Sequence, residues 1–115
     1  MTNETKKKLF DSPFTNVPYP IGDGVQRTYK FKNGYGASVV RFKILNSYSS
    51  YTDNEREWEL AVLKFNKNGD WYLTYETPIT NDVIGHLKKN DVESILQKIN
   101  KLKKTNTIIK QRIYE

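Results

Sequence analysis

The sequence contains no cysteine, a single histidine and no long apolar run. Without cysteine the chain has no disulfide, no thiolate zinc site and no cysteine nucleophile, which suits a reducing cytoplasm. No apolar stretch follows Lys6, Lys7 and Lys8 as a secretory signal requires, and the run at residues 60–63 is too short to cross a bilayer. We therefore expect a cytoplasmic protein that makes no membrane contact.

Motifs of nucleotide-binding and catalytic sites are also lacking. There is no Walker loop, and Gly34-Tyr35-Gly36 lacks the third glycine and the following helix of a dinucleotide fingerprint. The lone histidine, His86, cannot form a cluster of imidazole ligands, and we expect it at the surface without a catalytic role. The sequence thus predicts no enzyme, no catalytic residue and no cofactor.

Acidic residues recur at every second position in Asp53, Glu55, Glu57 and Glu59. On a strand these four would share one face, and clustered carboxylates can hold Mg²⁺ or Ca²⁺. However, the first two fall in an expected loop, where Arg56 separates them from the others. We interpret the set as a solvated acidic edge that pairs with Lys or Arg on a neighbouring strand, and we expect no metal site.

What the chain does have is aromatic residues and positive charge. Aromatic residues make up 13% of the 115 positions, which argues against disorder and predicts one domain with a small aromatic core. The net charge is +6. Residues 25–45 contain five basic residues and no acid, and the stretch from residue 88 to the end is also strongly basic. Such asymmetry favours either an anionic partner or a solvated basic surface.

Four segments have the alternation or the inner-strand composition of β-strands, namely residues 25–32, 35–45, 56–66 and 71–76. Asn33-Gly34 and the glycine-containing turn at residues 66–70 predict hairpins between neighbouring strands. The second and third segments carry apolar residues on both faces, as inner strands do. We expect an α+β fold with a four-stranded antiparallel meander.

The remaining segments complete one domain. Residues 1–24 form a proline-rich arm, expected to be irregular and to lie partly across the sheet or a partner, and residues 25–76 form the sheet. Residues 77–104 are the helical part. There, Thr80 or Asn81 begins a short helical turn, and Asn90 with Glu93 caps an amphipathic helix over 91–103 that packs on one sheet face. Residues 105–115 are a C-terminal segment, within which 107–113 form an edge strand or an ordered tail.

Three stretches carry a resemblance: NGYGASVVR at residues 33–41, WELAVL at 58–63 and YETPITNDVIG at 75–85. In this order they resemble a group of short uncharacterised proteins encoded by bacteriophages and prophages. The resemblance spans about residues 33–102 and implies a phage origin, with no catalytic residues to carry over. Small phage proteins often act by binding a host protein, so the resemblance favours a role in the host cytoplasm.

Two functions remain open. The first is protein–protein contact with a host or phage protein, as an inhibitor or modulator of host machinery, with aromatic anchors in a loop and an acidic edge beside them. Its expected site residues are Tyr48, Tyr51, Glu55, Glu57 and Glu59. The alternative is nucleic-acid binding by a basic, aromatic-bearing sheet face. Its expected site residues are Arg27, Lys30, Lys32, Arg41 and Lys43.

The chain also has more apolar strand surface than one helix can cover. The second face of the sheet must be covered by the arm, by residues 107–113 or by another subunit, because a large exposed apolar patch is unusual on a monomer. We expect a homodimer rather than a monomer.

Overall fold

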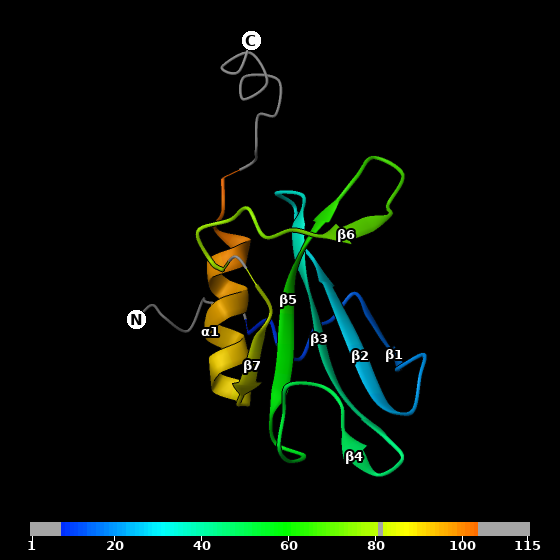
Figure 1. Cartoon of the computed structure of the whole chain (residues 1–115). Helices are drawn as coiled ribbons and strands as arrows, with labels where there is room; N and C mark the ends of the chain where they lie inside the picture. Colours follow the sequence, from blue (N-terminus) through cyan, green and yellow to red (C-terminus); the bar gives the residue numbers. More distant parts are fainter. Residues whose placement is uncertain (1–7, 81, 104–115) are drawn as a thin grey trace.

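The strands form a twisted antiparallel sheet in which successive side chains point to opposite faces. A single helix packs on one of these faces (Figure 1). The computed structural model describes residues 8–80 and 82–103. The strands are β1 (Thr15–Pro18), β2 (Asp23–Lys30), β3 (Tyr35–Ile44), β4 (Ser47–Tyr48), β5 (Trp58–Phe65), β6 (Trp71–Leu73) and β7 (Ile84–Leu87). The helix is α1 (Lys89–Asn100). The α+β class, the antiparallel sheet and the C-terminal helix are therefore confirmed.

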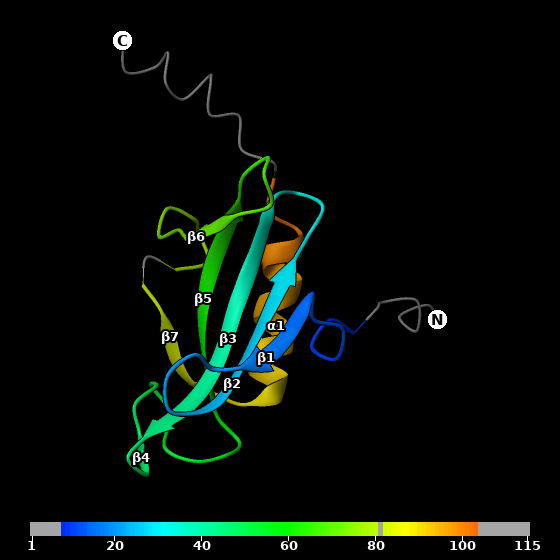
Figure 2. The ribbon, with the colours of Figure 1, turned by 90° about the vertical axis from the view of Figure 1, so that its right-hand side faces the viewer.

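The sheet has the order β1-β2-β3-β5-β6, with β4 paired to β3 and β7 paired to β5. Figure 2 shows the sheet in front of α1, with β3 and β5 at its centre. β6 pairs with the end of β5 at residues 63–65, whereas β7 pairs near its start at residues 58–60. The expected meander β2-β3-β5-β6 exists, but the count of four strands was wrong because β1, β4 and β7 extend it.

All three added strands lie where the sequence predicted none, and the short β4 falls in the loop expected after residue 45. β1 occupies part of the arm expected to be irregular, and its only neighbour is β2, so Pro18 sits at the sheet edge where a missing N–H is tolerated. β7 replaces the expected helical turn before residue 88, and it is extended except at His86, whose φ is 55°. Asn81 and residues 105–115 lie outside the described part of the chain.

The main core lies between α1 and the sheet. Val92, Leu96 and Ile99 are fully buried on one side of α1, with Ile95 partly buried beside them, so the expected apolar stripe is confirmed. They pack against the helix-facing residues of the central strands. These are Tyr29, Tyr35, Ala37, Val39, Trp58, Leu60 and Val62. Each fully buried Val, Leu or Ile side chain contributes about 1.5–3 kcal/mol by leaving water.

The helix begins two residues earlier than expected. Its N-cap is Lys88, and the carboxylate of Asp91 accepts the Lys88 N–H at 3.0 Å. The Asn90–Glu93 capping pair was therefore wrong, although an acidic group three residues after the cap is present. Asp91 also places a negative charge in the first turn, where the helix dipole favours it.

Glu93 instead fastens the N-terminal arm to the helix. Its carboxylate accepts the Leu9 N–H at 2.9 Å and the Phe10 N–H at 2.9 Å. Partial burial alone would raise the pKa of Glu93, but these backbone donors and the Gln97 amide lower it on balance. The Phe10 ring joins the core edge-on to Trp58, with ring centroids 5.7 Å apart.

Candidate functional site

On the sheet face opposite α1, here called the outer face, larger side chains cover a set of small buried residues. Cross-strand partners share a face, so the registers place Leu73 beside Leu63, Trp71 beside Phe65 and Lys30 beside Gly36. The buried small residues of this face are Thr28, Gly36, Ser38 and Ala61. A Cβ on Gly36 would lie 2.7 Å from the Phe65 ring and 1.9 Å from the Tyr29 carbonyl oxygen. Glycine is therefore required where the Phe65 ring crosses the strand.

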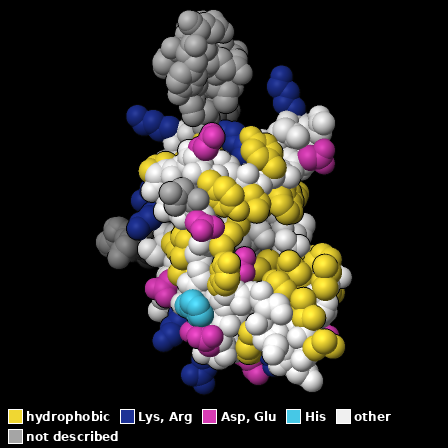
Figure 3. Space-filling view, viewed as in Figure 1, with side chains coloured by type: hydrophobic (Ala, Val, Ile, Leu, Met, Phe, Trp, Pro, Cys, Tyr) yellow, Lys and Arg dark blue, Asp and Glu magenta, His cyan; other side chains and the backbone are white. Residues whose placement is uncertain are grey.

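A continuous row of aromatic and apolar groups crosses this face. The Lys30 ammonium lies 5.2 Å from the Phe14 ring centroid and 5.3 Å from that of Phe65, and Trp71 follows on β6. We call Phe14, Lys30, Phe65, Trp71 and Leu73 the outer strip. Its two ends are open to solvent, with Phe14 60% exposed and Trp71 41% exposed. Hydrophobic side chains gather over β6 in Figure 3.

A second exposed apolar area lies at the lower end of the sheet, where β3 meets β4 (Figure 3). Its exposed members are Ile21, Ile44 and Leu45. Leu45 is 94% exposed and, like the next residue, has a positive φ in the turn between the two strands. Behind it the Tyr19 and Phe42 rings stack with centroids 3.9 Å apart, so this end of the sheet is well packed.

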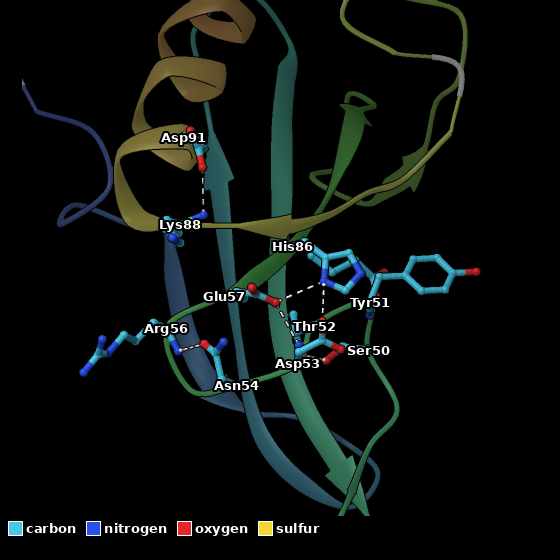
Figure 4. A network of polar contacts seen from close by, with 11 residues as sticks. Ser50, Tyr51, Thr52, Asp53, Asn54, Arg56, Glu57, His86, Lys88 and Asp91 are labelled. Carbon is cyan, nitrogen blue, oxygen red and sulfur yellow. Dashed lines mark hydrogen bonds and ion pairs between the residues drawn. The ribbon is translucent and has the colours of Figure 1, made fainter.

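The loop of residues 49–57, which connects β4 to β5, meets β7 in a polar network (Figure 4). The His86 N–H donates to the Tyr51 carbonyl at 2.7 Å, and a Cβ on Gly85 would lie 2.4 Å from the Tyr51 Cβ. The close approach of the two backbones therefore requires glycine beside His86. Inside the loop, the buried hydroxyls of Ser50 and Thr52 are 2.8 Å apart and hydrogen-bonded.

Two carboxylates and the imidazole converge in this network. Glu57 Oε1 accepts the Asp53 N–H at 2.8 Å and lies 3.0 Å from His86 Nδ1. Asp53 Oδ2 lies 3.4 Å from the same nitrogen. The Asp53 backbone N–H is the main cause of the lowered pKa of Glu57, and the His86 contact adds to it.

The five residues expected to form a protein-binding site separate into two groups. Tyr51, Glu57 and Glu59 lie together, since Glu59 Oε1 accepts the Tyr51 N–H at 3.0 Å. Tyr51 is 60% exposed as a residue, whereas the Glu57 side chain is only 14% exposed. Tyr48 and Glu55 instead line a surface hollow with Lys43, whose ammonium lies 4.8 Å from the Tyr48 ring centroid. The expected continuous acidic edge is not formed.

The five basic residues expected for nucleic acid also divide. Arg27 and Arg41 lie on the helix side, where their guanidinium carbons are 5.5 and 4.2 Å from the Trp58 ring centroid. Arg27 Nη1 also donates to the Phe10 carbonyl at 2.9 Å. Lys30 points to the outer face, Lys43 contacts Tyr48, and Lys32 lies in the turn between β2 and β3. These charges therefore make no single continuous basic face.

Two features were not predicted from the sequence. The strand expected at residues 71–76 does not by itself show that Trp71 and Leu73 lie at an exposed end of the outer strip. The sequence also does not link His86 to the acidic residues, because nothing in their spacing shows that β7 returns beside residues 53–57. The apolar content of both strand faces was the signal that could have located the outer strip.

Comparisons with known proteins add no relative: the chain matches no family model, and no curated protein or solved structure gives a significant match. In residues 8–80 and 82–103, no helix is long and apolar enough to cross a membrane. The class of the molecule is therefore defined by its fold alone, a small α+β domain with one helix on an antiparallel sheet.

Proposed function

We propose that this chain is a small non-enzymatic, phage-encoded binding protein that acts in the host cytoplasm through protein–protein contact, as an inhibitor or modulator of host machinery. The single observation that carries the proposal is the outer strip, with Trp71 and Leu73 exposed at one end and Phe14 at the other. The phage origin rests on the resemblance of residues 33–41, 58–63 and 75–85 to short phage proteins. The fold supports the binding role, because the rigid sheet lies beneath the strip.

Aromatic side chains on a rigid sheet suit protein recognition. Large rings bury much area on docking and lose little conformational entropy, so they dominate interface energies. Trp71 lies beside Phe65 in the register of β6 with β5, and the Phe65 ring lies against Gly36. The strip is thus preorganised, which lowers the entropic cost of binding.

The partner that fits this surface is a protein with an apolar patch of its own. The only cation of the strip, Lys30, lies between two rings and adds a positive charge at its centre. A partner with one acidic group inside an apolar patch would match both features. Tyr51, on the loop near β7, and Glu59, at the start of β5, form a second and separate contact area under the same proposal.

The test is affinity capture from host lysate, with and without nuclease, using matched variants of β6. Trp71→Arg places a charge on the outer face, while Tyr72→Arg places it on the opposite face of the same strand, where Tyr72 is 55% exposed. We expect one nuclease-resistant protein to be retained by wild type and Tyr72→Arg and lost with Trp71→Arg. Equal retention by all three proteins would refute the outer strip as the binding surface.

Nucleic-acid binding is the alternative, and the division of the basic residues counts against it. Binding to phosphates depends on several cations acting together and weakens steeply with salt. Here Arg27 and Arg41 already stack on Trp58, and the Lys30 ammonium lies between rings. Gel shifts with single- and double-stranded DNA and RNA decide the matter. Binding that survives physiological salt and is lost in Lys30→Glu with Lys32→Glu would establish the alternative.

A further inference from the structure

Three potential metal ligands from two separate segments meet at the surface between the β4–β5 loop and β7. They are Asp53, Glu57 and His86, and one ligand atom of each lies within 4.8 Å of the others. Figure 4 shows the two carboxylates directed at the same edge of the imidazole. None of the three belongs to the outer strip, but the cluster adjoins the second contact area at Tyr51, whose carbonyl accepts the His86 N–H.

We propose that Asp53, Glu57 and His86 bind a divalent transition-metal ion, zinc foremost, through His86 Nδ1 and one oxygen from each carboxylate. Ligands about 2.0–2.1 Å from a tetrahedral zinc ion lie roughly 3.3 Å from one another. His86 Nδ1 is 3.0 Å from Glu57 Oε1 and 3.4 Å from Asp53 Oδ2, so two of the three separations already match. The third separation, between the two carboxylate oxygens, is within 4.8 Å.

The ligand chemistry selects the kind of ion. Imidazole suits zinc and its first-row neighbours, whereas Mg²⁺ and Ca²⁺ prefer sites made wholly of oxygen. One nitrogen and two carboxylate oxygens leave a fourth tetrahedral position for water. The His86 side chain is 55% exposed and Asp53 78% exposed, so the ion can enter directly from solvent.

The surroundings favour a cation in two ways. In the described part of the chain, no Lys or Arg nitrogen lies within 4.0 Å of the Asp53 or Glu57 carboxylate, so no fixed ion pair competes for them. Hydrogen bonds also orient the ligands from behind, because the Asp53 N–H holds Glu57 Oε1 at 2.8 Å and the Tyr51 carbonyl accepts the His86 N–H. Such supporting contacts raise metal affinity by fixing ligand geometry.

The bound ion would fasten the β4–β5 loop to β7. Near His86 the described contacts between these segments are the His86–Tyr51 backbone hydrogen bond and the imidazole–carboxylate contacts. An ion would join the same segments through three ligands, and because it binds only the folded arrangement it would stabilise that arrangement. The role of the ion would be structural, because it would hold in place the backbone that carries the exposed Tyr51 ring.

The experiment uses the full chain, freed of any histidine tag and treated with chelator. Zn²⁺ is titrated against a competing chromophoric chelator, and Co²⁺ is titrated separately to record the visible absorption of a tetrahedral site. We expect one Zn²⁺ per chain, with affinity reduced more than tenfold in His86→Asn and in Glu57→Gln. Asp70→Asn, an exposed acid in the β5–β6 turn, is the control and should bind as wild type does.

The substitutions are chosen to keep the fold. Asn tolerates the positive φ of His86 better than most residues, and Gln keeps an oxygen that can accept the Asp53 N–H. If His86→Asn nevertheless melts earlier in the absence of metal, Glu57→Gln and Asp53→Asn carry the test. The proposal is overturned if wild type does not bind Zn²⁺, if all variants bind it as wild type does, or if Mg²⁺ or Ca²⁺ binds more tightly than Zn²⁺.

Discussion

The two faces of β3 and β5 differ less in composition than in what covers them. Toward α1, Val39, Leu60 and Val62 are sealed by the helix and by Phe10. On the outer face, Leu63 and Phe65 are also buried, but by neighbouring side chains of the sheet whose own outer surfaces meet solvent. A strand with apolar residues on both faces therefore does not reveal whether a second layer exists.

Because of this difference, the residues that matter most for stability and the residues available for binding lie on different faces of the sheet. Residues that face α1 contact several elements, so truncating one of them leaves a cavity that cannot close. The exposed residues of the outer strip have solvent on one side and are free to exchange water for a partner. We expect substitutions to lower the free energy of unfolding most on the helix-covered face and least at the ends of the outer strip.

Leu96→Ala should have the largest effect. Leu96 is fully buried between α1 and the sheet, and its truncation should destabilise the domain by about 2–5 kcal/mol. Lys98→Ala, exposed on the opposite side of the helix, is the control and should change stability by less than about 0.5 kcal/mol. Urea unfolding followed by circular dichroism measures both. Similar midpoints for the two variants would contradict the assigned helix face.

Gly36→Ala should come next and tests whether the outer face is packed. The added Cβ would meet the Tyr29 carbonyl oxygen and the Phe65 ring, so we expect a loss of about 3 kcal/mol. Gly34→Ala is the matched comparison: apart from its own residue and its two chain neighbours, no atom lies within 4 Å of its Cβ position, and only its φ of 89° is unfavourable. Its cost should be about 1–2 kcal/mol. Thermal melts that rank the two in the reverse order would show that Phe65 does not lie firmly over Gly36.

Glu93→Gln tests how the N-terminal arm helps to seal the helix-covered face. Replacing the carboxylate weakens its bonds to the Leu9 and Phe10 N–H groups, at a cost of about 1–2 kcal/mol. Glu76→Gln, at an exposed position, should have little effect. The measurement is the free energy of unfolding of each variant at neutral pH.

The same contacts predict a pH dependence. The pKa of Glu93 is lower in the folded state than its ordinary value of 4.5, so the folded state holds the proton less tightly than the unfolded state. The stabilisation is therefore complete above about pH 4.5 and is lost as the pH falls through the lowered pKa. The stability difference between wild type and Glu93→Gln should shrink in acid. A difference that grows below pH 4.5 would contradict this assignment.

What could be predicted from sequence follows from local pattern. The helical spacing of apolar residues predicted α1, and its buried or partly buried members are Val92, Ile95, Leu96 and Ile99. The positive φ of Gly34 and Gly69 agrees with the two predicted hairpins. β1 and β7 could not be predicted in this way. Pro18 disfavours a strand unless it lies at an edge, and which strand lies at an edge is a property of the whole sheet.

The candidate sites depend on long-range contacts still more. Asp53 and Glu57 are close in sequence, but His86 reaches them only because β7 pairs with the start of β5. Similarly, Phe14, directly before β1, and Trp71, on β6, belong to one strip because β2, β3 and β5 lie side by side between β1 and β6. No periodicity within a single segment carries that information.

The smallest effect on stability is expected at Trp71, where the effect on association should be large. In Trp71→Arg the long side-chain stem can still cover the Phe65 ring and its guanidinium can reach solvent, so the loss should be below about 1 kcal/mol. If the outer strip pairs with a second copy, as the predicted homodimer requires, light scattering at micromolar concentration should give a dimer for wild type and Tyr72→Arg. Trp71→Arg should then be monomeric, because a dimer would bury two unpaired guanidinium groups. A monomeric wild type would contradict the homodimer and leave the strip free for a different protein.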